Sequence, residues 1–419
     1  MEEAPLKVNA SRLWDSLMEL ASLGATPKGG VRRLALTDLD RQARDLVGGW
    51  LREAGLDLRV DRIGNIFARR AGTNPLAAAV ATGSHIDTQP SGGKFDGNYG
   101  VLAGLEVVRL LRDHNIRTER PIEVCIWTNE EGSRFTPVMM GSGVWAGAID
   151  EEAALAATDR DGHSVRKELE RIGYAGTFPC GPTGPHPAFA AYFEAHIEQG
   201  PVLEDAGVPI GEVLGALGQR WFDVTIHGMD AHAGPTPMGL RKDAVLAAGH
   251  LIRTVHQIAC DHAPHGRGTV GSVRVEPNSR NVVAGLAQIS VDFRHPDTAG
   301  LDAMEQSLRE ACVPLAMQLG VSTAIKQVSA FVPCAFDPAC RQAIAQSIAA
   351  HGLRSMPIVS GAGHDAVYVA RRSPAGMIFI PCKDGISHNE IEDALPEHVE
   401  AGANVLLGAM LRMAGSTRL

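Results

Sequence analysis

"LAAAVATGSHIDTQPSGGKFDGNYGVLAGLEVVRLLRDH", residues 76–114, is the stretch that decides the fold. It opens with a short apolar run typical of a buried strand, passes through a glycine-rich segment, and ends with apolar residues at helical spacing. Further apolar runs follow at "IEVCIWTN" and "AFAAYFEAHIE", with helical stretches between such runs. This alternation predicts an α/β sheet with helices packed on its faces.

The same pattern surrounds this stretch on both sides. Before it, the sequence predicts a helix at "SRLWDSLMELASLG", behind a Ser N-cap, and another at "TDLDRQARDLVGGWLREAG". After about residue 330 come a helix at "CRQAIAQSIAAHG", strands at "MPIVSG" and "MIFIP", and a closing helix at "PEHVEAGANVLLGAMLRMAG". We therefore predict that 1–213 and 330–419 are two segments of one mixed-sheet α/β domain.

The chain between these segments has a different order of elements. Strands are predicted at "RWFDVTIHG", "TVGSVRVEPN", "LAQISVDFRHP" and "STAIKQVSA", with helices at "RKDAVLAAGHLIRTVHQIA" and "DAMEQSLREACVPLAMQLG". The resulting β-α-β-β-α-β order is that of a ferredoxin-like α+β unit. We expect residues 214–329 to form an inserted domain of this kind.

Composition excludes several classes of function. The 39 Lys and Arg against 48 Asp and Glu give a net charge of −9, without a basic run for nucleic acid. The acidic N-terminus lacks an apolar signal core, and no window approaches the roughly 18 apolar residues of a membrane span. The seven Cys are scattered and form no C-x-x-C pair, which favours buried thiols over disulfides. We predict a cytoplasmic protein with neither nucleic acid nor membrane as partner.

The glycine-rich segment carries the first candidate site residues. His85 and Asp87 are two apart, so on an extended chain they point to the same side, and the Asp87 carboxylate could orient the His85 ring as in many metal sites. Asp96 follows the glycines and could turn back toward His85. The alternative is a glycine-rich turn with a capping Asp, since H-x-D is a short pattern.

A second cluster follows the strand at "IEVCIW". In near-extended backbone, the adjacent Glu130 and Glu131 point in different directions, so one can bind a metal while the other faces the metal-bound water. A hydrolase needs this division, because the metal acidifies the water and a free carboxylate takes the proton. Taken alone, the pair is more often a solvated acidic loop.

Two more strand ends carry histidines, His196 in "YFEAHIEQGP" and His388 in "DGISHNEIE". Each alone is more often an ordinary polar residue than a ligand. Together, five candidates fall at or just after predicted strands of the α/β domain: His85, Asp96, Glu131, His196 and His388. This set of nitrogen and oxygen donors, with one carboxylate free to bridge, suits two zinc ions, with manganese or cobalt as alternatives.

Longer motifs connect these residues to a known family. "GSHIDT", "GGKFDGNYGVLAGLEV", "NEEGSRF", "EAHIEQGPVLE", "GMDAHAGPTPM" with "RKDA", and "SGAGHDA" with "GISHNE" occur in order between about residues 10 and 410. They resemble the amidase, hydantoinase/carbamoylase family of the dinuclear M20 metallohydrolase superfamily. The resemblance implies a homodimer in which the inserted domain serves as lid and dimerisation domain.

The resemblance also implies a role for each matched residue. It makes Asp96 the bridging carboxylate, places His85 and His196 on one metal and Glu131 and His388 on the other, and makes Glu130 the general base. Peptidase relatives use a carboxylate where this chain has His196, which points to the carbamoylase branch. The residues assigned to the substrate by the same resemblance are Gln199, Gly363, and the pair Asn281 and Arg294 that holds its carboxylate.

His232 in the inserted domain is implied to reach the partner subunit's site and polarise the scissile carbonyl. On chemistry alone, His227 and His295 are equally good candidates, and Arg294 could simply face solvent at the end of its strand. No G-x-S-x-G elbow and no phosphate-binding loop is present.

The function expected from the sequence is hydrolysis of the carbamoyl C–N bond of an N-carbamoyl amino acid, a small ureido acid. Allantoate amidohydrolase or β-ureidopropionase activity with the same residues is the alternative. A peptidase or aminoacylase is less favoured because of His196. A non-catalytic binding protein would be expected to lack a ligand or one of the two glutamates, and this sequence keeps them all.

Overall fold

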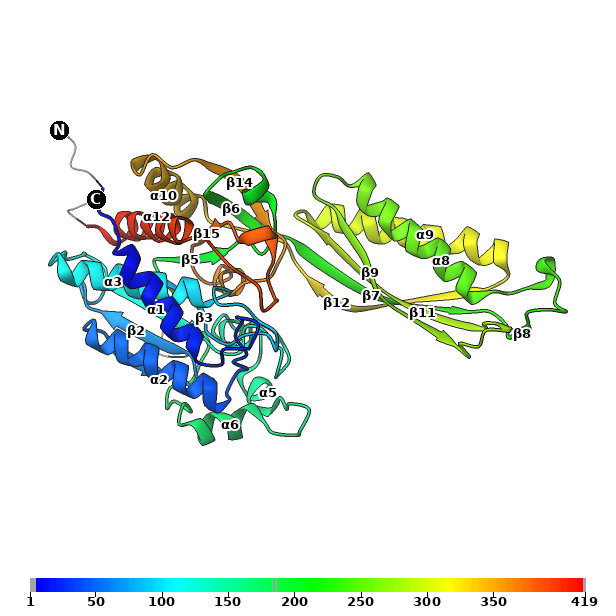
Figure 1. Cartoon of the computed structure of the whole chain (residues 1–419), viewed down its shortest axis with the longest axis horizontal. Coiled ribbons are helices and arrows are strands. Elements are labelled where there is room, and N and C mark those ends of the chain that lie inside the picture. The colour runs from blue at the N-terminus through cyan, green and yellow to red at the C-terminus, as the bar shows by residue number, and fades with distance from the viewer. Residues whose placement is uncertain (1–4, 183, 185–186, 417–419) are drawn as a thin grey trace. The chain divides into compact units, whose positions relative to one another are not determined.

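The computed structural model describes residues 5–182, 184 and 187–416. The chain forms two compact units, one of Met1–Gly215 with Ala335–Leu419 and the other of Ala216–Cys334 (Figure 1). Among the described residues, no helix combines the length and apolar composition that crossing a bilayer requires.

A large mixed sheet organises the first unit. Its strand order is β1-β2-β4-β3-β5-β15-β6-β13, with β14 also paired to β6. The strands are β1 (Asp57–Val60), β2 (Ile66–Arg70), β3 (Val80–His85), β4 (Ile122–Trp127), β5 (Ala191–Ile197), β6 (Ile210–Ala216), β13 (Cys334–Ala335), β14 (Ser355–Ser360) and β15 (Ala375–Ile380). β4, β3, β5 and β15 run parallel to one another, whereas β2 and β6 are antiparallel to their neighbours β4 and β15. The predicted mixed α/β class is confirmed.

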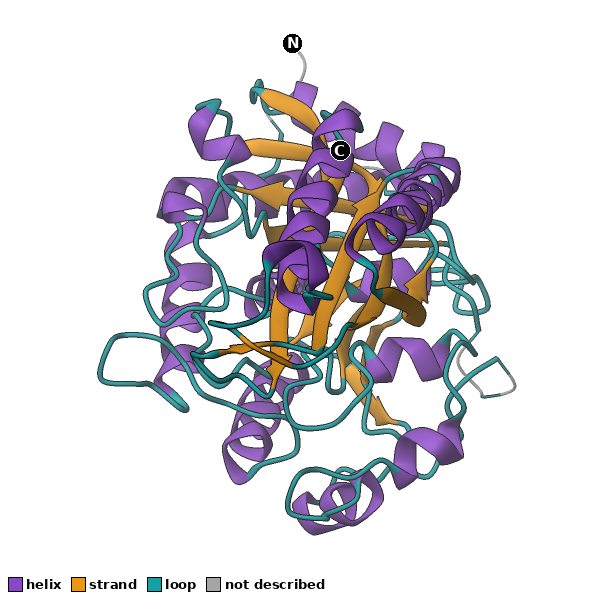
Figure 2. Ribbon diagram, turned by 90° about the vertical axis from the view of Figure 1, so that its right-hand side faces the viewer, coloured by secondary structure: helices purple, strands orange, loops and turns teal. Residues whose placement is uncertain are grey.

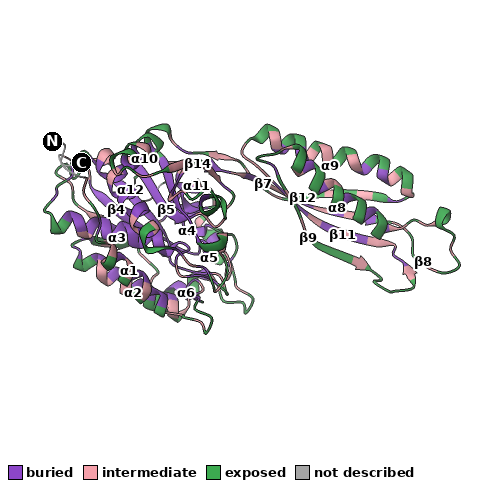
Figure 3. Ribbon diagram, turned by 45° about the horizontal axis from the view of Figure 1, so that its top comes forward, coloured by how far each residue is buried: buried purple, intermediate pink, exposed green. Residues whose placement is uncertain are grey.

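Helices cover both faces of this sheet (Figure 2). The main cluster on one face contains α1 (Ala10–Ser22), α3 (Asn98–Asp113), α10 (Pro338–Ala350) and α12 (Pro396–Ala414), and α2 (Asp38–Glu53) lies beside α1 and β1. The four central strands are buried along their whole length, as expected for parallel strands between helix layers (Figure 3). Shorter helices complete the unit: α4 (Met140–Trp145), α5 (Glu151–Ala156), α6 (Val165–Ile172), α7 (Val202–Asp205), α11 (Asp365–Val369) and the 3₁₀ turn at Lys383–Gly385.

The start of α1 differs from the prediction. Asn9, not Ser11, is the N-cap, and its side chain accepts a hydrogen bond from the Arg12 backbone N–H. Asn and Ser cap about equally well, so propensity did not separate the two positions. α2 begins as the sequence indicates, with Thr37 capping the Asp40 N–H.

The second unit has the β-α-β-β-α-β order. It consists of β7 (Gly218–His227), α8 (Ala244–Asp261), β9 (Arg267–Glu276), β11 (Leu286–His295), α9 (Thr298–Leu319) and β12 (Ser322–Phe331), in an antiparallel sheet ordered β12-β7-β11-β9. Alternate residues such as Phe222, Val224 and Ile226 pack with both helices in one core. A short ribbon of β8 (Ala231–His232) and β10 (Val282–Val283), and a 3₁₀ turn at Met238–Leu240, were not predicted.

Candidate metal centre

The candidate ligands gather at the carboxyl ends of the parallel strands. His85 ends β3 and His196 lies near the end of β5, and the pairing of Thr82 with Phe193 brings the two histidines level. Glu130 and Glu131 follow the end of β4, and His388 follows β15 after the 3₁₀ turn. Open α/β sheets commonly bind ligands at this edge, so the parallel core itself brings the four segments together.

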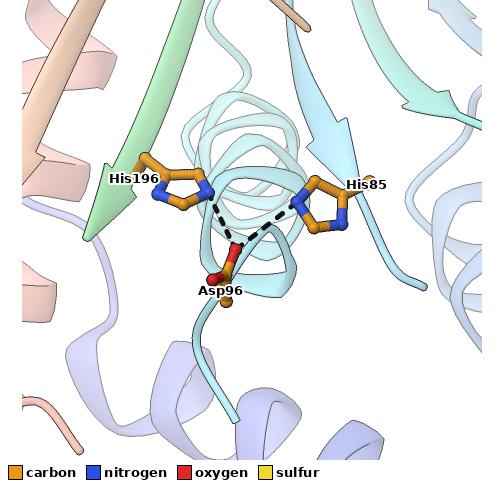
Figure 4. Close-up of side chains that lie close together, drawn as sticks. All are labelled: His85, Asp96 and His196. Atoms are coloured by element: carbon orange, nitrogen blue, oxygen red, sulfur yellow. Dashed lines mark ion pairs between the residues drawn. The ribbon is translucent and has the colours of Figure 1, made fainter. Parts of the chain in front are cut away.

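Asp96 lies at the middle of the cluster (Figure 4). Its Oδ1 is 3.5 Å from His85 Nε2 and 3.3 Å from His196 Nε2. Its Oδ2 is 3.5 Å from His388 Nε2, which in turn is 3.4 Å from Glu131 Oε2. Asp96 therefore presents one oxygen to each of two donor groups, His85 with His196 and Glu131 with His388.

Each donor group is compact enough for an ion. The donor atoms of His85, Asp96 and His196 lie within 4.8 Å of one another, and so do those of Asp96, Glu131 and His388. Imidazole and carboxylate donors of this kind suit borderline divalent cations.

The histidine rings are held in the form that binds a metal. Nδ1 of His85 donates to the Asp87 carbonyl at 2.9 Å, and Nδ1 of His196 donates to the Ile197 carbonyl at 2.9 Å, because a carbonyl oxygen can only accept. The Gly97 N–H donates to Nε2 of His196 at 3.1 Å, as expected for an unprotonated nitrogen. Nε2 of both rings is therefore the nitrogen left to bind a metal, and it lies on the side of Asp96.

Asp87 contacts His85 through a different group from the one that the sequence suggested. Its carbonyl, not its carboxylate, makes the close contact with His85, since Oδ1 is 3.8 Å from Nδ1. The carboxylate instead accepts from the Glu130 and Glu131 backbone N–H groups, at 3.3 Å each. Asp87 thus links the β3 and β4 segments, a role that the H-x-D spacing did not reveal.

The two glutamates occupy different positions. Glu131 accepts from the side chain of Gln89 at 2.7 Å and from its backbone N–H at 3.1 Å, which fixes its carboxylate beside His388. Glu130 belongs to neither compact donor group, and its Oε2 lies 3.6 Å from His85 Nε2. Glu130 is therefore a buried carboxylate that lies beside the donor groups but belongs to neither of them.

The site carries an excess of buried negative charge. Burial raises the pKa of Glu130 well above its ordinary value, only partly opposed by His85, and burial likewise raises the pKa of Glu131. Burial lowers the pKa of His85, but Glu130 and Asp96 outweigh it and raise that pKa overall. Divalent cations would neutralise this charge.

Three side chains that contact Asp96 complete this region. The Gln199 amide and the Ser387 hydroxyl each donate to Asp96 Oδ2 at 2.8 Å, while Gln199 Oε1 is buried without a hydrogen-bond partner among the described residues. Glu392 accepts from the Asp96 backbone N–H at 3.1 Å, and its Oε2 lies 3.1 Å from Ser387 Oγ. The sequence motifs named only Gln199, and nothing in their spacing pointed to Ser387 or Glu392.

Gly363, the remaining candidate of the first unit, lies in the loop between β14 and α11. A Cβ atom at this position would come within 2.9 Å of Met139 Cε. Because it has no side chain, Gly363 leaves room for the side chain of Met139.

The inserted unit separates the residues predicted to bind the substrate carboxylate. His232 pairs with Val282, and the Ala233 N–H donates to the Asn281 carbonyl, so His232 of β8 and Asn281 are neighbours beyond the end of β7 and the start of β11 (Figure 1). Arg294 lies eight residues along β11 from Leu286, about 26 Å at 3.3 Å per residue. In one copy of this unit Asn281 and Arg294 therefore lie toward opposite ends of β11, and their joint role in holding a carboxylate stays a prediction.

Comparison with known proteins bears on the chemistry of this site. The model of peptidase family M20/M25/M40 matches residues 81–412. The N-carbamoyl-L-amino-acid amidohydrolase of Rhizobium meliloti is 46% identical over 97% of both chains, and that of Geobacillus stearothermophilus is 38% identical over 97% of this chain and 99% of its own. An amidase of the hydantoinase/carbamoylase family from Burkholderia multivorans has a similar structure, with a TM-score of 0.94, 56% identity, and coverage of 97% of this chain and 98% of its own.

Proposed function

This chain belongs to peptidase family M20/M25/M40, and from that premise we propose that it is a metal-dependent amidohydrolase acting on N-carbamoyl amino acids. It cleaves the carbamoyl C–N bond and releases the amino acid, ammonia and carbon dioxide. The resemblance found in the motifs is confirmed by the family match and by the close relatives. Two of those relatives carry the name of this activity, which favours it over the allantoate and β-ureido acid alternatives.

The observation that carries the proposal is the arrangement of two groups of imidazole and carboxylate donors around Asp96. His85 and His196 would hold one divalent ion, Glu131 and His388 a second, and Asp96 would bridge them. We propose zinc, with manganese or cobalt as alternatives. When bound, such ions acidify a water molecule and polarise the substrate carbonyl.

Glu130 is the proposed general base. Its carboxylate is buried beside the donor groups, so it can accept a proton from the attacking water and return it to the leaving nitrogen. Asp87 positions it through the Glu130 N–H. Burial raises the pKa of Glu130, so this carboxylate holds a proton more readily than an exposed one would.

Substrate binding is proposed to involve Gln199 and Gly363 of the first unit, with His232, Asn281 and Arg294 of the inserted unit. Because His232 and Asn281 lie far from Arg294 along the inserted unit, we propose that they come from a second copy in a homodimer. The inserted unit would then act as lid and dimerisation domain. We also propose a cytoplasmic location, on the cysteine pattern of the sequence.

Replacing the proposed base tests this function. Glu130→Gln keeps the shape of the side chain but cannot accept the proton, so turnover of N-carbamoyl amino acids should fall by at least about 10²-fold with metal content unchanged. Glu131→Gln is the matched control, and it should lose metal as well as activity. Near wild-type turnover by Glu130→Gln would refute the role of the base. A panel with allantoate and N-carbamoyl-β-alanine decides between the substrates.

A further inference from the structure

Arg33 is a fully buried cation that lies outside the donor groups of the metal centre. Its guanidinium donates to the Ile86 carbonyl at 2.8 Å and to Asn98 Oδ1 at 2.7 Å. It also donates to two carbonyls at the end of α1, those of Leu20 at 3.0 Å and Leu23 at 2.7 Å. In the described part of the chain it forms no ion pair with a carboxylate.

Two of these partners belong to the segments that carry the ligands. Ile86 stands between His85 and Asp87, and Asn98 begins α3 two residues after Asp96. The Arg33 backbone adds two bonds to the first segment, since its N–H donates to Thr88 Oγ1 at 2.8 Å and its carbonyl accepts the Thr88 N–H at 2.9 Å. Arg33 therefore contacts the His85 segment and the Asp96 segment at once.

The His85 segment in turn orients the rest of the centre. The Asp87 carbonyl fixes the His85 ring, and the Asp87 carboxylate holds the Glu130 and Glu131 N–H groups. A shift of residues 86–88 would therefore move a ligand and both glutamates together. Metal–ligand distances normally lie within about 0.2 Å of their typical values, so such a shift would weaken coordination.

We propose that Arg33 is a positioning residue that sets the affinity of the metal centre by joining the segments of His85 and Asp96. The inference rests on the metal binding included in the proposed function. A lysine could not replace it, because a single ammonium group lacks the planar fork that reaches Ile86, Asn98 and the α1 carbonyls together.

The charge of Arg33 supports the same role. Burial lowers its pKa to about 10, opposed by the charges of Asp40 and Asp87, so the group stays protonated at neutral pH. An uncompensated cation is costly to bury. Here it lies against the segment whose carboxylates are in excess, which offsets part of that cost before any metal binds.

Metal affinity measured without substrate tests the proposal. We would titrate the chelated full-length protein with Zn²⁺ against a competing chelator, and with Co²⁺ while following its visible absorption, for the wild type, Arg33→Lys and Arg33→Met. The control is Arg44→Met, since Arg44 is equally buried but bonds to Asp40, Gly64 and Thr128 rather than to the two ligand segments.

Both Arg33 variants should bind Zn²⁺ at least about 10-fold more weakly and show an altered Co²⁺ spectrum, whereas Arg44→Met should change stability but not affinity. If Arg33→Met fails to fold, Asn98→Ala, which removes one of the two links, should weaken binding in the same direction. Wild-type affinity in Arg33→Lys would overturn the proposal. Absence of metal binding by the wild type would instead refute the proposed function on which it rests.

Discussion

A methyl group placed at Gly97 should displace His85 and empty one side of the metal centre. Gly97 has φ +68°, and the Cβ of an alanine there would lie 2.4 Å from Cε1 and Nε2 of His85. Ordinary contacts between such atoms are about 3.5–4.0 Å, so the ring must withdraw by about 1 Å. That movement is several times the spread of about 0.2 Å within which metal–ligand distances normally lie.

The cost in stability follows from the same geometry. Overpacking a tight site costs about 1–3 kcal/mol, and a side chain in this region of backbone space costs about another 1–3 kcal/mol. Gly97→Ala should therefore lower the free energy of unfolding by about 2–6 kcal/mol. Gly55→Ala is the matched control, because Gly55 has φ +90° but no neighbouring atom of the residues that the structure describes lies within 4 Å of the added Cβ.

Urea unfolding followed by circular dichroism, together with the metal content of each purified protein, measures both effects. We expect Gly55→Ala to lose only the backbone part of the stability and to keep its metal. Gly97→Ala should also lose metal bound by His85. If Gly97→Ala keeps wild-type metal content and turnover, the position of His85 is not as constrained as the structure indicates.

Two further predictions concern stability away from the donor groups. Burial raises the pKa of Asp61 to about 7, so the folded state keeps a proton that the unfolded state loses above about pH 4. Stability from this group is then present below about pH 4 and falls by at most about 4 kcal/mol as pH rises to 7. In urea unfolding measured between pH 5 and 8, the stability of Asp61→Asn should not show this fall. If the stabilities of the wild type and of Asp61→Asn change with pH in parallel, the raised pKa of Asp61 is refuted. Asp243 caps α8 through the Val245 and Leu246 N–H groups, at 3.0 Å each, so Asp243→Ala should cost about 1 kcal/mol without changing metal content. An unchanged denaturation midpoint would disprove the cap.

The sequence predicted most of the framework because strand and helix periods are local signals. The four central strands and the order of the inserted unit could be recognised from runs of apolar residues alone. The five candidate ligands then followed from their common position at or just after strands, and the structure brings the other four together around Asp96.

Features that depend on tertiary contacts were not predictable in this way. The sequence "VRRLAL" does not reveal that Arg33 is buried while the adjacent Arg32 is exposed. The choice between carbonyl and carboxylate of Asp87 depends on where the Glu130 segment lies. The distance between Asn281 and Arg294 requires the strand register of β11, which motif matching ignores.

The separation of His232 from Arg294 along the inserted unit has a genetic consequence. If each active site uses Arg294 of its own chain and His232 of the other chain, two inactive variants can complement each other in a mixed dimer. In a mixed dimer of His232→Ala and Arg294→Ala chains, both defects fall in one site and the other site is intact. Equal mixing and random reassociation should then restore about a quarter of wild-type activity. If His232 and Arg294 of the same chain instead served the same active site, every site of the mixed dimer would carry a defect and no activity would return.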